Sequence, residues 1–200
     1  MPEREFITLI PTFEQLEGNL VIIRPWEESD APDLFAAVQE SREHLRPWLP
    51  WADQYQRIEQ SYEWIHHQQA SWLLRTVLSC AVREKAGGRL LGGLGIHPHD
   101  WQLGIFEIGY WLRHDATGHG YMTEAVRLAT ECAFERWQAN RIVIRCDERN
   151  ERSAAIPRRL GFVFEGCLRN EALAPDGQLR NTLVFALTPA DHWQASQYSK

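Results

Sequence analysis

The segment "IFEIGYWLRHDATGHGYMTEAVRL" (Ile105–Leu128) changes character twice within 24 residues. β-Branched and aromatic residues dominate its first part, which is typical of a β-strand. After Gly118 and Gly120 a helix is expected to about Trp137, because apolar residues recur there at helical spacing: Met122, Ala125, Val126, Ala129 and Ala133. The segment therefore predicts a strand, a glycine loop and a helix in direct succession.

The two glycines permit two interpretations. The first N–H groups of a helix have no internal acceptor, and the helix dipole adds positive charge there. Glycine lets the backbone approach a phosphate closely, so the loop could hold an anion. A plain strand-to-helix turn would look the same. The pattern is neither a Walker A loop nor a G-x-G-x-x-G fingerprint.

Strand-like and helical runs extend outward on both sides of this segment. "LVIIRPW" (Leu20–Trp26) and "RIVIRCD" (Arg141–Asp147) are rich in β-branched residues, and Asp176-Gly177 is a hairpin signal. The predicted order is β-α-α-β-β-β-α-β-α-β-β. It indicates one α+β domain with a mostly antiparallel sheet and one parallel crossover. We place the domain at residues 20–190, between an N-terminal arm (1–19) and a C-terminal tail (191–200).

Composition limits the function classes. The chain has 200 residues, 44% of them hydrophobic, and a formal net charge of -6. The negative charge argues against a general nucleic-acid binder. No signal peptide and no run of ~18 apolar residues is present, so we expect a cytoplasmic protein that is not in a membrane. The four cysteines and the histidine pairs lack metal-site spacing, so we expect buried free thiols and no metal.

Three blocks in the chain resemble the GNAT acetyltransferase superfamily, and most closely its RimJ/RimL-like branch of ribosomal-protein N-terminal acetyltransferases. They are the "IGYWL" strand, "GHGYMTEA" and "NERSAAIPRRLGF". The resemblance runs from about Leu20 to Leu187. It implies six or seven strands with acetyl-CoA between two splayed central strands, Glu107–Arg113 and Arg141–Asp147. It is also compatible with a homodimer.

The resemblance implies a set of cofactor-binding residues. The backbone from Tyr110 to Leu112 would line the pantetheine, and Asn150 would contact the pantetheine or phosphate region. Asp115 stands where many members have Gln or Arg, and Arg113 could offset its charge. The N–H groups of the glycine segment would hold the pyrophosphate. The full set of cofactor-binding residues that the resemblance implies is Tyr110, Trp111, Leu112, Arg113, Gly118, His119, Gly120, Tyr121, Met122, Thr123 and Asn150.

Ser153 is the candidate proton donor to the CoA sulfur. Many members have a tyrosine as general acid at the position of Pro157, whereas the RimL-like branch shares this departure and has a serine earlier, which is Ser153 here. Serine is also a favoured N-cap, so Ser153 could cap the short helix that follows it. The two roles can coexist.

Two carboxylates are candidate bases for the acceptor amine, which must be unprotonated to react. Glu107 lies in an apolar strand, so it either faces solvent or lines a cleft, on the same face as Gly109 and Trp111. In the RimL-like branch the glutamate would fall at the position of Ala172, and Glu171 lies one residue earlier. A one-residue slip reverses the face of a strand, so either a bulge restores Glu171 or it points away.

The remaining candidates concern the loop histidine and the acceptor side. His119 would lie beside the pyrophosphate, about a pantetheine length from the thioester, so we expect a loop residue and not a base. Trp48, Trp51 and Tyr55 follow two proline breaks and either wall a substrate groove or pack the helices onto the sheet.

Together these features predict an acetyl-CoA-dependent N-acetyltransferase that transfers acetyl directly to an amine. The resemblance favours a protein N-terminal α-amino group as acceptor, as in ribosomal proteins. The alternatives are acetylation of a small amine (a polyamine, amino sugar or amino-acid derivative) and a non-catalytic CoA-binding module.

Overall fold

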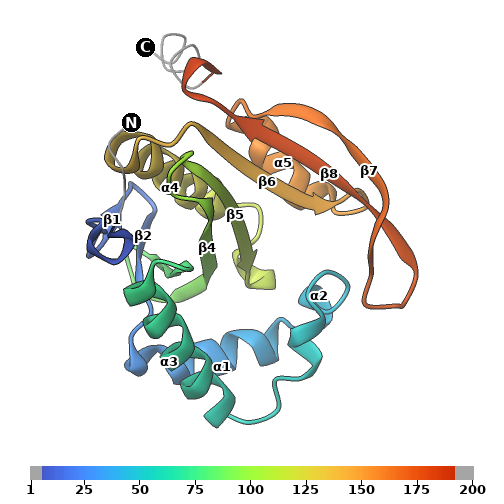
Figure 1. Ribbon diagram of the computed structural model, residues 1–200. Helices are drawn as coiled ribbons and strands as arrows, with labels where there is room; N and C mark the ends of the chain where they lie inside the picture. Colours follow the sequence, from blue (N-terminus) through green and yellow to red (C-terminus); the bar gives the residue numbers. More distant parts are fainter. Residues whose placement is uncertain (1–5, 192–200) are drawn as a thin grey trace.

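A computed structural model describes residues 6–191 and shows one eight-stranded sheet with helices on both faces (Figure 1). The strand order is β1-β2-β3-β4-β5-β6-β8-β7, and every neighbouring pair is antiparallel except β5 and β6. The strands are β1 (Leu16–Glu17), β2 (Val21–Pro25), β3 (Leu78–Glu84), β4 (Leu90–Asp100), β5 (Ile105–Leu112), β6 (Arg141–Asp147), β7 (Val163–Leu173) and β8 (Leu179–Leu187).

The expected α+β domain with a mostly antiparallel sheet is confirmed. The sheet has one strand more than the six or seven expected, because two residues of the expected N-terminal arm form β1 beside β2. Phe13, also from that segment, is buried in the core. The division of the chain at residues 19 and 190 stays a prediction.

Two buried clusters hold the helices to the sheet. On one face, α1 (Ala31–Glu40), α2 (Arg42–Leu45), η3 (Pro50–Asp53) and α3 (Glu59–Leu74) pack around Trp26 and Leu90. On the other face lie α4 (Tyr121–Trp137) and α5 (Glu151–Arg159). The helical stripe predicted for α4 is fully buried there, as expected: Met122, Ala125, Val126, Ala129 and Ala133.

The two central strands separate along their length. The parallel strands β5 and β6, which α4 connects, pair only from Ile105 with Arg141 to Glu107 with Val143. Beyond this point β5 continues beside β4 to Leu112, and β6 continues beside β8 to Asp147. The expected splay between these strands is therefore confirmed, and it opens a gap in the middle of the sheet.

The hairpin of β7 and β8 forms the far edge of the sheet. Its register shifts between Leu168, which lies opposite Thr182, and Ala172, which lies opposite Arg180. Two extra residues are therefore accommodated in β7, and Asn170 adopts a φ of 53° in this irregular segment. Cys167 is exposed on β7, so the expectation that all four thiols are buried was wrong for this one. An edge strand of a single sheet leaves its side chains open to solvent.

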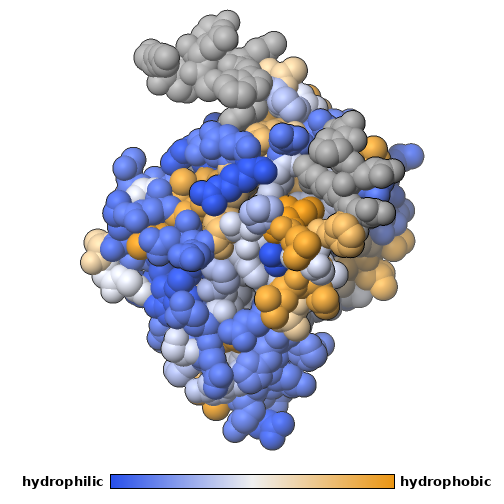
Figure 2. All heavy atoms as spheres, turned by 60° about the vertical axis from the view of Figure 1, so that its left-hand side comes forward, coloured by the Kyte–Doolittle hydropathy of each residue, from blue (hydrophilic) through white to orange (hydrophobic). Residues whose placement is uncertain are grey.

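The side of the molecule at the left of Figure 1 is mostly hydrophilic, with hydrophobic residues gathered in several places (Figure 2). The exposed apolar side chains on the elements of that side include Phe6, Leu9, Leu73 and Leu74. Within residues 6–191, no helix is both long and apolar enough to cross a bilayer.

Candidate active site

A cleft of about 1420 Å³ passes through the gap between β5 and β6. Its walls come from five parts of the fold: the splayed strands, the start of α4, one side of α5, the segment from α2 to η3, and the end of the β7–β8 hairpin. The cleft therefore reaches both faces of the sheet, and a ligand on one face can meet a ligand from the other in the gap.

The glycine loop forms one end of this cleft. Gly118 and Gly120 have φ values of 86° and 81°, a region in which any other residue would be strained. The Glu124 N–H makes the first helical bond of α4, to the Gly120 carbonyl, so the preceding N–H groups of the helix lack internal acceptors. The arrangement fits an anion such as a diphosphate, as the anion-site interpretation required.

Two of the expected cofactor-binding residues do not reach the cleft. His119 lies outside the lining and places its ring 5.7 Å from the ring of Tyr121. Arg113 is buried and pairs with Glu40 and Asp115. Burial would raise the pKa of Asp115, but hydrogen bonds from Arg89 and Arg113 outweigh it and hold that pKa below its usual range. Arg113 offsets the Asp115 charge as expected, but it is not free to hold a cofactor.

Glu124 ties the glycine loop to the N-terminal part of the sheet. Its carboxylate accepts hydrogen bonds from the N–H groups of Asn19, Leu20 and Val21 at 2.9, 2.7 and 3.0 Å. A Cβ at Gly18 would lie only 2.4 Å from a Glu124 oxygen. Sequence reasoning missed this contact, because an acidic residue in the first turn of a helix is ordinary and needs no distant partner.

Ser153 does not cap α5. The cap is Asn150, whose Oδ1 accepts the Ser153 N–H at 3.1 Å. The Ser153 hydroxyl instead donates to the Tyr110 Oη at 3.3 Å, and the Tyr110 phenol donates to the Ser153 carbonyl at 2.9 Å. All three residues line the cleft. The capping interpretation of Ser153 was therefore wrong, and its hydroxyl lies beside a phenol that sequence reasoning had noted only for its backbone.

Burial keeps the Tyr110 phenol and the Cys146 thiol near Ser153 protonated. Burial raises the pKa of the Tyr110 phenol above its usual range, and a hydrogen bond with Ser153 only partly offsets this. Burial likewise raises the pKa of Cys146 to about 11. Because the thiolate is the reactive form of cysteine, Cys146 is a poor nucleophile, which agrees with its expected role as a core residue.

Glu107 borders the gap but does not line the cleft. It belongs to the last residue pair of β5 and β6, and its carboxylate lies 3.2 Å from the His99 imidazole of β4. Its side chain is 26% exposed. Of the two expected environments, the structure therefore gives Glu107 a partly exposed position with a histidine neighbour.

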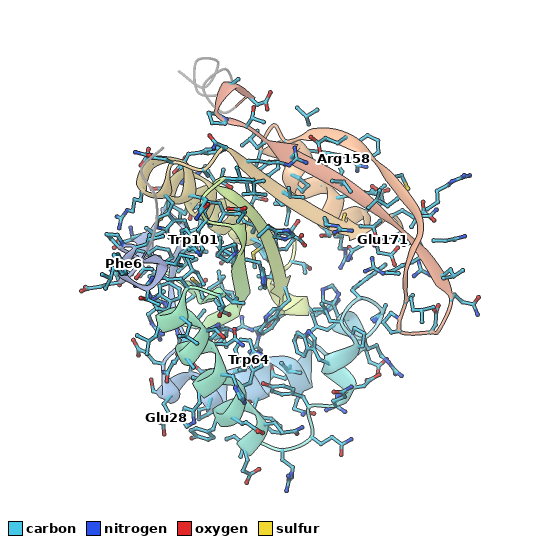
Figure 3. All side chains as sticks on the ribbon, viewed as in Figure 1. Phe6, Glu28, Trp64, Trp101, Arg158 and Glu171 are labelled. Carbon is cyan, nitrogen blue, oxygen red and sulfur yellow. The ribbon has the colours of Figure 1, made fainter. Side chains whose placement is uncertain are left out.

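Glu171 is oriented by the irregular segment of β7 and is labelled in Figure 3. It forms an ion pair with Arg145 of β6, and its second carboxylate oxygen accepts the Thr182 hydroxyl at 2.8 Å. The Thr182 hydrogen bond, together with the charge of Arg145, holds the pKa of Glu171 below its usual range. Arg145 lines the cleft and Glu171 does not, so Glu171 stands behind an arginine.

The three aromatic candidates on the acceptor side divide into two groups. Trp48 lines the cleft. Trp51 and Tyr55 pack into the core, with ring centroids 5.9 Å apart and Trp51 6.0 Å from Trp111. A substrate-groove role therefore stays a prediction for Trp48, which alone of the three lines the cleft, and packing explains the other two.

The cleft is basic although the chain is acidic. Its lining contains more arginines than carboxylates. The six arginines are Arg127, Arg145, Arg149, Arg152, Arg159 and Arg180, and the four carboxylates are Glu43, Glu124, Asp147 and Glu151. Four of these arginines lie between residues 145 and 159, and Arg127 and Arg180 come from other elements, so the net charge of the chain could not reveal their convergence. A basic cleft attracts an anionic ligand. No group of three potential metal ligands occurs in the part of the chain that the structure describes.

Comparison with known proteins agrees with this geometry. The family described as "Acetyltransferase (GNAT) domain" matches residues 21–163. "Putative ribosomal N-acetyltransferase YdaF" of Bacillus subtilis (strain 168) is 29% identical over 181 residues, covering 88% of this chain and 95% of YdaF. The ribosomal protein uS5-alanine N-acetyltransferase of Escherichia coli (strain K12) is 26% identical over 191 residues, covering 88% and 92%. One solved structure is RimL, a ribosomal L7/L12 alpha-N-protein acetyltransferase, in complex with coenzyme A. It superposes with a TM-score of 0.81 at 21% identity, and the match covers 88% of this chain and 98% of the RimL chain.

Proposed function

The chain belongs to the GNAT acetyltransferase family and is an N-acetyltransferase, and from this premise we propose that it transfers acetyl from acetyl-CoA directly to a protein N-terminal α-amino group. The observation that carries this proposal is the cleft that joins an anion-binding helix start on one face of the sheet to an open wall on the other. Such a passage lets a donor and an acceptor meet without a covalent enzyme intermediate.

The residues that would hold acetyl-CoA follow from the cleft lining. The N–H groups at Gly118, Gly120 and the first turn of α4 would hold the diphosphate, and β5 from Tyr110 to Leu112 would lie along the pantetheine. When bound, acetyl-CoA supplies an activated acyl group as a thioester. The six cleft arginines support a polyanionic cosubstrate over a neutral one.

The protein's own groups supply a proton on one side of the gap. Ser153 holds its hydroxyl toward the cleft beside the Tyr110 phenol, and both remain protonated near neutral pH. We assign Ser153 as the donor to the leaving sulfur, with Tyr110 as its hydrogen-bond partner. Glu107 lies at the other end of the splay, where an acceptor amine would arrive. Glu171 is better placed to orient Arg145 than to accept a proton.

The acceptor class rests on the relatives and on the shape of the cleft. The E. coli relative is named as an alanine N-acetyltransferase of ribosomal protein uS5. In the present chain, the segment from Pro47 to Pro50 and the hairpin end at Pro175 line the cleft on the proposed acceptor side, where we infer that the end of a polypeptide would bind.

The test is to supply acetyl-CoA with three acceptor sets and to follow the release of free thiol. One set contains peptides with free N-termini, including ribosomal-protein N-terminal sequences. The second contains the same peptides with blocked N-termini and an internal lysine, and the third contains polyamines, amino sugars and amino acids. Mass spectrometry of the products locates the acetyl group, and calorimetry measures CoA binding without turnover.

We expect thiol release with the first set only. Turnover confined to the third set would replace the protein acceptor by a small amine. Binding of CoA with no turnover on any acceptor would identify a non-catalytic CoA-binding module.

A further inference from the structure

The proposed function leaves one proton without an acceptor, namely the one that the amine loses when it attacks. The N-terminal α-amino group has a pKa of about 7.7–8.0, so a large share of it is protonated at neutral pH. A base with a pKa near or below 7 on the acceptor side of the gap would complete the reaction.

The acceptor side can be identified from the two faces of the sheet. Ile96, Ile108 and Ile144 point to the face that α4 covers, where the glycine loop would hold the cosubstrate phosphates. Side chains alternate along a strand, so the residues between them point to the opposite face. On β4 and β5 that face carries Gly95 and His97 beside Glu107 and Gly109. An acceptor that enters past Trp48 arrives on this second face.

His97 lies on β4, one strand from the gap, and its ring extends toward Gly109 of β5, which lines the cleft. Gly95 and Gly109 are cross-strand partners, as are His97 and Glu107. The His97 Nε2 lies 2.7 Å from the position that a Cβ at residue 95 would occupy and 3.8 Å from that of a Cβ at residue 109. Gly109 lines the cleft and is the second residue of β5 beyond the last pair with β6. Two glycines thus leave room for the imidazole at the edge of the gap.

The surroundings of His97 favour its neutral form, and the residue is still exposed to solvent. The residue is exposed, but one side of its ring lies against the strand backbone, and this desolvation lowers its pKa from the ordinary value. The charge of Glu107 on β5 partly offsets the desolvation, and His99 on β4 adds to it. A neutral imidazole can accept a proton at neutral pH.

We propose that the His97 Nε2 accepts the proton from the acceptor amine and that Glu107, its cross-strand neighbour, orients and supports the resulting imidazolium. This inference rests on the proposed function. As the amine nitrogen bonds to the acetyl carbon, its proton passes to His97, the carbon–sulfur bond breaks, and Ser153 protonates the sulfur. His97 then gives its proton to water, and Ser153 takes a proton back from water, which restores both groups. Glu107 is the less suitable base, because its carboxylate is engaged by His99 at 3.2 Å.

The test compares His97→Gln with His99→Gln, a matched change two residues along the same strand that keeps a donor for Glu107. We expect His97→Gln to lower kcat about 100-fold or more, since general bases contribute roughly 10²–10⁴. The Kd for CoA should stay within about twofold, because residue 97 lies on the other face. His99→Gln should keep kcat within about threefold. Gly95→Ala should lower kcat while His97 is present, because a Cβ there displaces the ring.

A second measurement does not depend on turnover. NMR titration of the free protein should show His97 titrating below its ordinary pKa of about 6.5, and lower still in Glu107→Gln, which removes the offsetting charge. In wild type the acid limb of kcat at saturating acceptor should follow the same group. Retention of kcat and of this limb in His97→Gln would overturn the inference, as would equal losses in His97→Gln and His99→Gln. A wild-type protein that binds no CoA, or binds it without turnover, would instead contradict the proposed function.

Discussion

At the scale of single residues, the contact between Ser153 and Tyr110 supports the proposed role of Ser153 as proton donor in a site that has no tyrosine at position 157. Pro157 is buried within α5 and offers no hydroxyl. The phenol that approaches the end of β6 comes instead from β5, and it donates to the Ser153 carbonyl at 2.9 Å. Because Asn150 caps the helix, the Ser153 hydroxyl is free for a second contact. The strand and the helix thus place two hydroxyl groups at one point of the cleft.

Ser153→Ala should lower kcat by about 100-fold, the lower range for a general acid, with little change in the KM for acetyl-CoA. Tyr110→Phe should lower kcat less, because the serine loses a partner and not its proton. Steady-state kinetics on both variants and on the double variant measure their coupling. We expect the double variant to be little slower than Ser153→Ala, since the two hydroxyls are in direct contact.

Tyr62→Phe is the matched control, because Tyr62 is a partly buried phenol in the other core cluster. Its kcat should equal that of the wild type. Fully additive losses in Ser153→Ala and Tyr110→Phe would show that the two hydroxyls act separately, contrary to the geometry.

At the scale of elements, the first turn of α4 is bound to the segment before β2 in addition to its own helical hydrogen bonds. The Glu124 carboxylate fixes the turn before β2 through three N–H groups. Burial would raise the pKa of Glu124, but these backbone donors outweigh it and hold that pKa below its usual value. The carboxylate therefore stays charged near neutral pH and is bound by the three backbone N–H groups. The clamp joins the glycine loop to the N-terminal strands.

Glu124→Gln should loosen this clamp. One amide oxygen cannot replace a carboxylate with three donors, so we expect the free energy of unfolding to fall by about 1.5–3 kcal/mol. Hydrogen exchange at the amides of Asn19, Leu20 and Val21 should accelerate. Glu131→Gln serves as control, because its partner Arg127 lies one turn away on the same helix and such pairs contribute only about 0.2–0.5 kcal/mol. Unchanged exchange at the three amides would contradict the clamp.

The element order, the parallel crossover and the splayed strands could be predicted because each depends on local periodicity or on a contiguous motif. The same holds for the glycine loop and for the buried stripe of α4. Features that depend on distant partners could not be predicted. Arg113 was assigned to the cofactor, but Glu40, 73 residues away, holds it elsewhere. In the sequence, His97 was considered only with His99 as a metal ligand and was rejected as one. Only strand pairing sets it beside Glu107.

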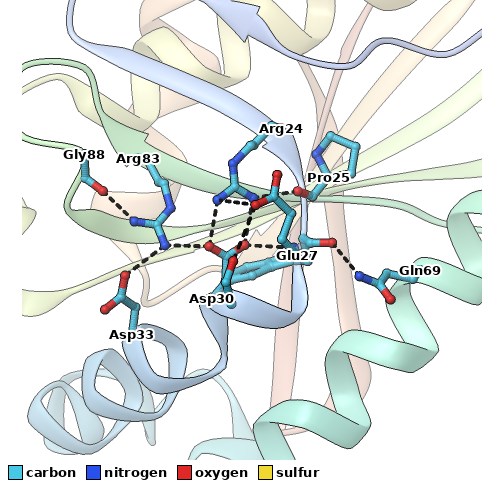
Figure 4. Close-up of polar contacts among 10 residues, drawn as sticks. Arg24, Pro25, Glu27, Asp30, Asp33, Gln69, Arg83 and Gly88 are labelled. Carbon is cyan, nitrogen blue, oxygen red and sulfur yellow. Dashed lines mark hydrogen bonds and ion pairs between the residues drawn. The ribbon is translucent and has the colours of Figure 1, made fainter.

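At the scale of the whole molecule, one buried carboxylate connects the helical layer to the sheet (Figure 4). Asp30, at the start of α1, is fully buried and accepts hydrogen bonds from Arg24 of β2 at 2.7 and 2.8 Å and from Arg83 of β3 at 2.5 Å. Through these two arginines, β2 and β3 are bound to the start of α1. The helix α1 leads into α2, which begins the segment that lines the proposed acceptor side of the cleft. The position of that segment depends on this network.

The last prediction concerns this network. Asp30→Asn leaves Arg24 and Arg83 without their shared carboxylate, and breaking a buried ion pair costs about 3–5 kcal/mol of unfolding free energy. Asp33→Asn is the matched control: Asp33 also pairs with Arg83, but its side chain is 52% exposed, so a loss of only about 0–1 kcal/mol is expected. Urea denaturation of both variants at neutral pH measures these values.

The pH dependence of the Asp30 contribution follows from its lowered pKa. Burial alone would raise the pKa of this carboxyl, but hydrogen bonds from Arg24, from the Glu27 backbone and from Arg83 outweigh burial and lower it. A group whose pKa is lower in the folded state stabilises the fold above its unfolded pKa of about 3.9 and loses that contribution as the pH falls through the folded value. The stability gap between wild type and Asp30→Asn should therefore be constant from about pH 7 to pH 5 and shrink below about pH 4. A difference in unfolding free energy that stays constant in acid would show that Asp30 acts through packing and not through its charge. Another group would then have to balance the charges of Arg24 and Arg83.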